Sequence, residues 1–346
     1  MTKRHTKQTS KQALGQYFTT NADRILSGFE DLIKNKNVID PFAGGWDLLY
    51  WAQKNGASSV SAYDIEPKVD GTELKDSLLN PPSYSGSFVL TNPPYLASNK
   101  SKSKYKDIFA KWNQSDLYKC FLASITNAEE AIVIIPSNFL CESNSKARSM
   151  LFASYNVVSA KYWKEQVFDD ATTGVCALYI KQKQGLNNGI QEFPCLLLPE
   201  NKQITMRLEK NHGYLHGGHE LTSLNRSFEF EKVYEQNINT NIVVGCLDGG
   251  KYELGFYYND KEPIRAPKTV ITTFQVNTVG FTLTESQQIE VIDCANAMLT
   301  RLRNQYDSMF LSNYMGATQK IMSVSIAKSL LSHATKKVVD KHTETV

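Results

Sequence analysis

The sequence predicts an α/β fold, in which a doubly wound, mostly parallel sheet ends in an antiparallel hairpin and a second C-terminal domain follows. Short β-branched runs alternate with helical stretches from about residue 35 to residue 183, as in parallel sheets covered on both faces. Beyond about residue 185 the chain becomes rich in Gly, Asn and aromatic residues and loses this alternation. A domain boundary is therefore expected there.

Local patterns predict the individual elements. Strands are expected at residues 37–40, 59–64, 87–91 and 131–136, and an antiparallel pair at 157–163 and 174–183. Helices are expected from Asp47 to Gln53 and from Asp116 to Asn127, each starting with an acidic residue. Apolar residues at helical spacing within 285–315 predict one long helix in the C-terminal region.

Composition excludes several classes of protein. Hydrophobic residues make up 41% of the 346 and charged residues 21%, which is typical of ordered globular proteins. There is no apolar run of about 18 residues and no signal-like start, so a cytoplasmic protein without a membrane partner is expected. The six cysteines include no CxxC pair, which predicts buried, reduced thiols rather than disulfides or a thiolate zinc site.

Acidic residues and glycines follow two of the predicted strands. Asp40 ends the first strand, and Gly44 and Gly45 form the turn into a helix, where glycine lets the backbone approach a ligand closely. Asp64 ends the second strand, where a carboxylate can accept hydrogen bonds from both ribose hydroxyls. Together they predict a nucleotide or nucleoside pocket, with a structural turn and a solvated acid as the alternatives.

The segment Thr91-Asn92-Pro93-Pro94-Tyr95 ends the third strand. Neither proline has an N–H, so carbonyl oxygens should point into the space above the strand. The Asn92 side chain and such a carbonyl would form a pair of acceptors for an NH2 group, and Tyr95 offers a face on which a planar base can stack. A simple Pro-Pro strand terminator is the alternative.

The chain resembles the adenine-N6 DNA methyltransferases of restriction-modification systems in which the cofactor motif precedes the catalytic motif and the target recognition domain is C-terminal. The resemblance covers residues 13–183 and rests on these segments in this order: Gly15-Gln16-Tyr17-Phe18-Thr19, Asp40-Pro41-Phe42-Ala43-Gly44, Asp64, Asp76-Ser77-Leu78 and Asn92-Pro93-Pro94-Tyr95. It implies a seven-stranded methyltransferase sheet. It also implies a flexible basic N-terminus at 1–12, a catalytic domain at 13–185 and a target recognition domain at 186–346.

The resemblance further implies S-adenosylmethionine as the cofactor. The implied cofactor-binding residues are Tyr17, Phe18, Thr19, Asp40, Pro41, Phe42, Gly44, Asp64, Ile65, Asp76, Ser77 and Asn92. Tyr17, Phe18 and Thr19 would line its methionine end, and Asp40 would face its amino group. Asp64 would bind the ribose and Asp76 the amine of its adenine.

On the substrate side, the resemblance implies a catalytic motif of Asn92, Pro93, Pro94 and Tyr95. Tyr95 and Phe168 would contact the flipped target adenine from its two sides. Nearby lysines, which are candidates for DNA phosphate contacts with a solvated loop as the alternative, are Lys100, Lys102, Lys104 and Lys106. One residue departs from the family pattern, because Trp46 stands where a second glycine is common, so Gly45 is expected to take over that role.

The expected function is therefore site-specific methylation of the adenine N6 amine in double-stranded DNA, by a monomer that protects DNA from a separate cognate restriction endonuclease. No metal site is expected, because His212, His216 and His219 lack a standard ligand spacing. Four alternatives remain open. They are methylation of a protein glutamine, of ribosomal RNA adenine or of cytosine N4 in DNA, and a non-catalytic nucleic-acid-binding module.

Overall fold

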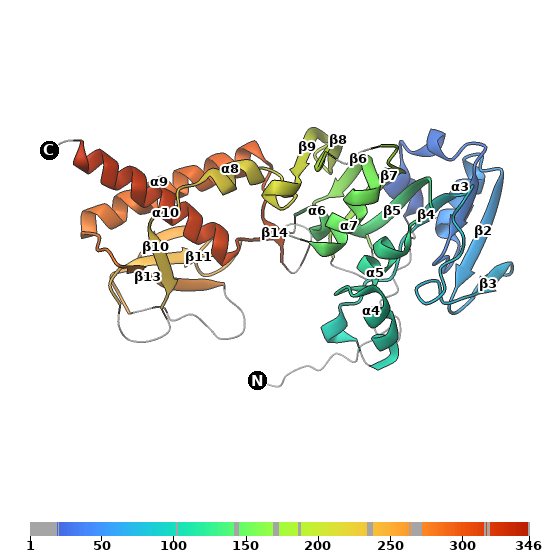
Figure 1. The fold of residues 1–346 in the computed structure, drawn as a ribbon, viewed down its shortest axis with the longest axis horizontal. Coiled ribbons are helices and arrows are strands. Elements are labelled where there is room, and N and C mark those ends of the chain that lie inside the picture. Colours follow the sequence, from blue (N-terminus) through green and yellow to red (C-terminus); the bar gives the residue numbers. More distant parts are fainter. Residues whose placement is uncertain are drawn as a thin grey trace. The chain divides into compact units, whose positions relative to one another are not determined.

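The computed structural model describes residues 19, 21–101, 103–141, 145–168, 173–185, 188–233, 238–262, 264, 272–314, 316 and 319–344. The chain divides into two compact units (Figure 1). The first consists of Met1–Phe139 and Asn144–Asn211, and the second of Leu140–Ser143 and His212–Val346. Within the described ranges, no helix combines the length and apolar character needed to cross a membrane.

The described residues of the first unit form a nine-stranded sheet in the order β3-β2-β1-β4-β5-β7-β6-β8-β9. Its strands are β1 (Asn37–Asp40), β2 (Ser59–Asp64), β3 (Thr72–Leu74), β4 (Phe88–Thr91), β5 (Glu130–Pro136), β6 (Tyr155–Trp163), β7 (Val175–Gln182), β8 (Ile190–Leu198) and β9 (Lys202–Glu209). Strands β1 to β5 pair in parallel, and β7 runs antiparallel between β5 and β6. The predicted α/β fold with a mostly parallel sheet and an antiparallel hairpin is confirmed.

Strands β8 and β9 correct two expectations. The described sheet has nine strands rather than seven, and the first unit ends at residue 211 rather than 185. The reason is pairing: β8 lies parallel to β6 from Ala160↔Cys195 to Trp163↔Leu198, and β9 pairs antiparallel with β8. Buried and exposed positions alternate along β8, as in a strand with one covered face, but its internal Pro194 weakens the strand signal in the sequence.

Helices connect the strands of the first unit. The α-helices that lie wholly or partly in it are α2 (Ala22–Leu26), α3 (Asp47–Lys54), α4 (Lys106–Trp112), α5 (Leu117–Ser124), α6 (Asn138–Cys141) and α7 (Lys146–Ser154). The short 3₁₀ helices are η1 (Glu30–Leu32), η2 (Ser98–Lys100) and η3 (Ser103–Tyr105). As predicted, Asp116 caps α5, because its side chain accepts a hydrogen bond from the Tyr118 N–H. Every residue of β4 is buried, as expected for a strand covered on both faces.

The strand order reverses between β1 and β4. The chain moves outward from β1 to β2 and β3, and then returns to place β4 on the other side of β1. The register Val38↔Phe88 and Ile39↔Val89 brings the carboxyl ends of the two strands together. Such a reversal leaves a crevice at the carboxyl edge of the sheet, which is where α/β folds bind ligands.

The second unit has a four-stranded antiparallel sheet in the order β10-β13-β11-β12 among its described residues. Its elements are β10 (Glu229–Lys232), β11 (Ile242–Gly245), β12 (Gly255–Tyr258), β13 (Thr273–Val279), β14 (Ser312–Asn313), β15 (Lys320–Ile321), α8 (Gly218–Ser223), α9 (Glu285–Gln305) and α10 (Val324–Thr343), and η4 (Lys210–His212) precedes them at the boundary. Helix α9 confirms the predicted long helix, and Thr284 and Gln287 form a capping box at its start.

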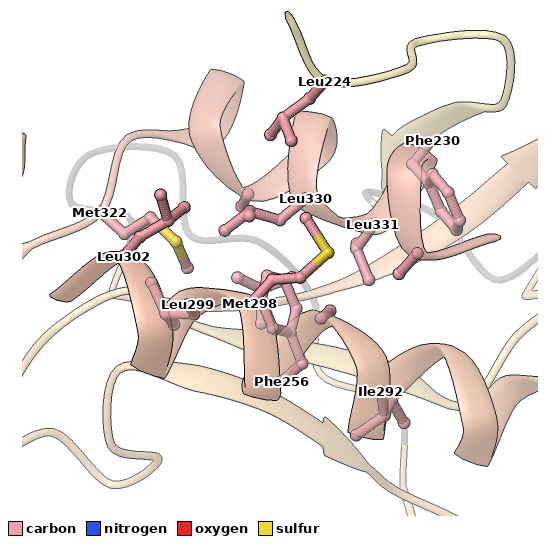
Figure 2. Packing of buried hydrophobic residues seen from close by; sticks show 14 of the residues in the cluster. Leu224, Phe230, Phe256, Ile292, Met298, Leu299, Leu302, Met322, Leu330 and Leu331 are labelled. Atoms are coloured by element: carbon pink, nitrogen blue, oxygen red, sulfur yellow. The ribbon is translucent and has the colours of Figure 1, made fainter. Parts of the chain in front are cut away.

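The core of the second unit lies between its sheet and its two long helices (Figure 2). Phe256 of β12 packs in one cluster with Leu299 and Leu302 of α9 and with Leu330 and Leu331 of α10. These apolar side chains recur at helical spacing along α9 and α10, so each helix turns one apolar stripe inward. The unit therefore has a hydrophobic core of its own.

The six cysteines are all free thiols. Five are buried, and Cys294 on α9 is partly exposed. Burial raises the pKa of Cys120 and of Cys246 to about 12. The prediction of buried, reduced thiols is thus confirmed for five of them.

Candidate active site

A pocket opens in the first unit at the carboxyl ends of β1, β2 and β4. Its empty volume, which includes space open to solvent, is about 830 Å³. The side chains and backbone that line it belong to Thr19, Asp40, Phe42, Ala43, Gly44, Gly45, Asp47, Leu48, Asp64, Ile65, Lys75, Asp76, Ser77, Leu78, Asn92, Pro94, Tyr105, Ile108 and Leu117. Its position, at the carboxyl edge of the sheet where the strand order reverses, is where α/β folds bind ligands.

Asp40 is the deeply buried carboxylate of this pocket. The Thr91 hydroxyl and the Phe42 N–H both donate hydrogen bonds to its Oδ1 atom, at 2.6 and 3.0 Å. Its Oδ2 atom accepts none from the described residues. Burial raises the pKa of Asp40 to about 7, although the two hydrogen bonds oppose this and the nearby charge of Asp64 adds to it. A cation bound beside Oδ2 would stabilise the charged carboxylate.

Asp64 fixes the glycine turn that follows β1. Its Oδ2 atom accepts a hydrogen bond of 2.9 Å from the Gly44 N–H, and its Oδ1 atom accepts one of 2.8 Å from the Glu66 N–H. Gly44 has φ +50°, a conformation that favours glycine. The carboxylate therefore holds the turn against the end of β2, and its remaining lone pairs face the pocket that it lines.

The turn at residues 76–79 forms another part of the wall. Asp76 accepts hydrogen bonds from the Leu78 and Leu79 N–H groups, both at 3.0 Å and both on Oδ1, so its Oδ2 atom has no partner among the described residues. The buried Ser77 hydroxyl also has no hydrogen-bond partner in the described chain. Buried polar atoms are rarely left unpaired, so this turn has acceptors and a donor to offer a ligand.

Asn92 reaches the pocket from the end of β4, and its carboxamide has a defined orientation. Its Nδ2 atom donates a hydrogen bond of 3.1 Å to the Thr19 hydroxyl, and its Oδ1 atom accepts one from the Tyr95 hydroxyl. The Tyr95 hydroxyl also lies 2.8 Å from the Ile134 carbonyl oxygen of β5. The acceptor oxygen of Asn92 is therefore engaged by the tyrosine of its own motif.

Two residues at the start of helix α4 form part of the pocket wall. Tyr105 and Ile108, three residues apart, both line the pocket. Helix α4 is bound to the turn at 76–79, because the Trp112 indole N–H donates a hydrogen bond of 2.8 Å to the Leu78 carbonyl and Lys111 donates one to the Leu79 carbonyl. The chain after Pro93-Pro94 thus returns to the pocket.

The structure brings together most of the residues predicted to bind a cofactor. Those that line the pocket are Thr19, Asp40, Phe42, Gly44, Asp64, Ile65, Asp76, Ser77 and Asn92, and Pro94 of the catalytic motif joins them. Pro41 and Pro93 do not line it. Tyr17, Phe18 and Lys102 lie outside the described residues.

The two aromatic residues predicted to hold a target base do not line the pocket. Tyr95 is buried, and its ring packs edge-to-face on Tyr118 at 6.1 Å. Phe168 is also buried, and its carbonyl accepts a hydrogen bond from the Gln166 side chain. A base could stack on either ring only after a rearrangement that exposes it. The described lysines of the candidate DNA contact, Lys100, Lys104 and Lys106, are all exposed.

Sequence reasoning missed several lining residues. They are Asp47, Lys75, Tyr105, Ile108 and Leu117. The spacing of Tyr105 and Ile108 was the available signal, because residues three apart share one helical face.

Trp46 corrects the expectation for the glycine turn. Gly45 does not take over the left-handed conformation, because Trp46 itself adopts it, with φ 67° and ψ 13°. The Trp46 indole N–H donates a hydrogen bond of 2.7 Å to the Thr72 hydroxyl, which anchors the bulky side chain. Trp46 therefore occupies a left-handed position of the turn itself.

The histidines of the second unit lie near a hydrogen-bond network centred on Glu220. Glu220 accepts hydrogen bonds from Arg301, Gln305 and Tyr306, and chiefly the bond from Arg301 lowers its pKa to about 2. His216 packs edge-to-face against the Tyr306 ring at 5.1 Å. Within the described part of the chain, no group of three or more His, Cys, Asp or Glu residues could hold a metal ion. Glu220 thus joins α8 to the end of α9.

Comparison with known families gives one match. Residues 16–168, less than half of the chain, match the family described as Eco57I restriction-modification methylase. This segment includes every pocket-lining residue. No curated protein sequence matches the chain.

Several solved structures are similar at low identity. A modification subunit attributed to a type I restriction enzyme from Vibrio vulnificus YJ016 has 15% identity over 60% of this chain and 51% of its own, with a TM-score of 0.43. The methyltransferase subunit of a type I restriction-modification system from Streptococcus thermophilus has 14% identity over 54% and 50%, with a TM-score of 0.38. The M protein of the type I restriction enzyme EcoKI has 13% identity over 96% and 73%, with a TM-score of 0.41. The chain spans about half the length of the first two proteins.

Proposed function

We propose that this protein is an S-adenosylmethionine-dependent methyltransferase of a restriction-modification system, acting on the N6 amine of adenine in double-stranded DNA. One observation carries the proposal. The pocket joins three strand-end or turn carboxylates, Asp40, Asp64 and Asp76, to the Asn92 side chain. The match of residues 16–168 to a restriction-modification methylase family supports the same activity.

The residues present fit the cofactor. Asp40 offers to an ammonium group an Oδ2 atom that accepts no hydrogen bond from the described residues, and Asp64 offers carboxylate lone pairs to ribose hydroxyls. At the other end, Asp76 and the unpaired Ser77 hydroxyl would bind the adenine ring, against the apolar side chain of Ile65. When bound, the cofactor supplies a methyl group on a positively charged sulfur, which is already activated for transfer.

Asn92 and Pro93 would hold the amine that accepts the methyl group. The nitrogen of an adenine amine is a poor nucleophile, because its lone pair is delocalised into the ring. Hydrogen bonds from this amine to the Asn92 Oδ1 atom and the Pro93 carbonyl would favour a pyramidal nitrogen and localise the lone pair. Such bonds would act by electrostatic stabilisation, and alignment of the two reactants would supply a further part of the rate.

The target base would have to leave the duplex, because its amine is paired there. Tyr95 and Phe168 are proposed to contact the flipped base after both rings become exposed. The exposed lysines Lys100, Lys104 and Lys106 would contact nearby phosphates. We further propose that the second unit recognises the target sequence and that the protein acts as a monomer, with its cognate endonuclease on a separate chain.

The proposal is tested by incubating the full-length protein with labelled S-adenosylmethionine and unmethylated genomic DNA. The expected result is N6-methyladenine at one recurring sequence, identified by nucleoside analysis and by mapping of the modified positions. Asn92→Ala serves as the control that should give at least about a hundredfold less product under initial-rate conditions. Label in RNA, in protein or in cytosine instead of adenine would contradict the proposed substrate, and cofactor that fails to bind at all would contradict the class of enzyme.

A further inference from the structure

Trp46 connects two segments of the pocket wall that are far apart in the sequence. The first is the turn from Ala43 to Leu48, which follows β1. The second is the segment from Lys75 to Leu78, which follows β3. The indole links the first segment to β3, the strand that precedes the second, because its N–H donates a hydrogen bond of 2.7 Å to Thr72, the first residue of β3.

The position of Trp46 has an energetic cost that needs an explanation. Its left-handed backbone, with φ 67°, is unfavourable for a residue with a side chain, because the Cβ atom crowds the following carbonyl oxygen. Glycine would avoid this cost. A large residue at such a position is expected only where its side chain makes compensating contacts.

The chain provides room and partners for the indole. Gly71, whose φ of +87° favours glycine, lies beside the ring, because a Cβ atom there would be 3.4 Å from the indole Cη2 atom, an ordinary contact distance. The exposed Tyr50 ring lies 5.8 Å from the Trp46 ring, one helical turn along α3. The Thr72 hydroxyl is therefore the specific polar partner of the indole.

The strand that Trp46 holds is a short one at the edge of the sheet. In the described structure β3 has three residues and pairs only with β2, from Ala62↔Thr72 to Asp64↔Leu74. The exposed Leu74 gives this strand little burial on its outer side. An edge strand with so few hydrogen bonds is held weakly. Asp76 and Ser77 follow it after one residue, so their position depends on that of the strand.

We infer that Trp46 is a positioning residue of the cofactor pocket, which fixes the turn after β1 relative to the segment that carries Asp76 and Ser77. Asp64 and helix α4 hold the two segments by other bonds, so without the Trp46 bond the ligand would have to restore only the position of β3 relative to the turn, and that cost would appear as weaker binding. The identity of the ligand rests on the proposed function. The role of Trp46 in holding the two wall segments together does not rest on the proposed function.

The test measures binding of S-adenosylhomocysteine by calorimetry, together with thermal unfolding, for four single variants and for the double variant of Trp46→Phe with Thr72→Val. Trp46→Phe keeps a ring but removes the donor, and Thr72→Val removes the acceptor at nearly constant volume. Thr72→Ser restores a hydroxyl, and Tyr50→Ala is the control that removes the exposed ring beside Trp46. Trp46→Phe and Thr72→Val should each weaken binding about tenfold, as expected for one lost hydrogen bond.

Three further outcomes decide the inference. The double variant should lose no more than either single variant, because both remove the same bond. Thr72→Ser should bind within about threefold of the natural protein, and Tyr50→Ala should bind normally at an unchanged kcat. Trp46→Phe and Thr72→Val proteins that fold and bind as tightly as the natural protein would overturn the inference. Absence of binding by the natural protein would instead contradict the proposed function.

Discussion

The Thr91 hydroxyl donates a hydrogen bond of 2.6 Å to the Asp40 carboxylate, and so joins the carboxyl ends of β4 and β1. These are the two strands between which the order of the sheet reverses. Asn92 follows Thr91 directly, so the carboxylate proposed to bind the cofactor and the amide proposed to bind the target amine are connected through one residue. The proposed cofactor site and the proposed site of the target amine therefore depend on the same pair of strands, β1 and β4.

Asp40→Asn should abolish tight cofactor binding and at the same time stabilise the protein above neutral pH. The substitution removes the charge that would pair with an ammonium group, which should weaken binding about 10–100-fold. It also removes the cost of burying an ionised group. Calorimetric binding and thermal unfolding at pH 8 measure the two effects. An unchanged affinity would exclude Asp40 from the ligand site.

The affinity for the cofactor should rise between pH 6 and pH 8, since the pKa of Asp40 lies at about 7 and only its charged form pairs with a cation. Folding stability should change in the opposite direction. Asp40 holds its proton more tightly in the folded protein than in the unfolded chain, where its pKa is 3.8. The free energy of unfolding should therefore fall as pH rises from about 4 through 7. Asp40→Asn should lose the pH dependence of affinity and show a smaller fall in stability, because Asp116, whose pKa burial raises to about 6, still contributes below pH 6.

Asn92→Ala should lower kcat by about 10²–10³-fold, because it removes an acceptor aimed at the reacting amine. Cofactor binding should change far less than kcat, because Asp40, Asp64 and Asp76 remain. Single-turnover methylation and calorimetry separate these quantities. A variant that binds the cofactor and still turns over at the natural rate would refute the role proposed for the amide.

Tyr95 distinguishes the effects of a ring and of a hydroxyl. Tyr95→Ala should lower kcat/KM for DNA, because it removes a stacking contribution of about 1–3 kcal/mol. Tyr95→Phe keeps the ring, so its kcat/KM should stay within about tenfold, while the Ile134 carbonyl loses a donor and unfolding becomes easier by about 1 kcal/mol. Methylation kinetics and thermal unfolding of both variants test this. Equal loss of activity in both would assign the function to the hydroxyl that contacts Asn92.

Glu220 should make the protein sensitive to acid. Its pKa of about 2 lies below the ordinary value of 4.5, so its hydrogen bonds with Arg301 and Tyr306 contribute stability at neutral pH that is lost as pH falls from about 4.5 toward 2. Glu220→Gln should lower the free energy of unfolding at pH 7 by about 1 kcal/mol, since the pair is partly exposed. Unfolding in denaturant at pH 3 and pH 7 compares the two proteins. A loss equal at both pH values would show that charge is not involved.

Much of the first unit could be predicted from the sequence because its signals are local. Strand ends at Asp40, Asp64 and Thr91 follow from β-branched runs that stop at polar residues. Residues 190–209, which form β8 and β9, belong to the first unit and not to the expected C-terminal domain, because a local sequence pattern does not reveal which sheet edge a strand will join.

The same limit applies within the candidate site. Asp40, Asp64 and Asp76 lie at strand ends or in the turn after β3 and were predicted, whereas Tyr105 and Ile108 reach the pocket only because α4 is bound to the turn at 76–79. That contact joins residues distant in sequence, and no local pattern encodes it. The left-handed Trp46 was unexpected for a related reason, since its partner Thr72 lies on another strand.

The burial of five cysteines gives the folded protein a simple chemical signature. A thiolate is the form that reacts with alkylating dyes, and burial with a pKa of about 12 suppresses it at Cys120 and Cys246. Cys294, on α9 of the second unit, is partly exposed and should label first. The native protein therefore accepts one dye at a known place, and the appearance of further labelled thiols counts the molecules that have opened.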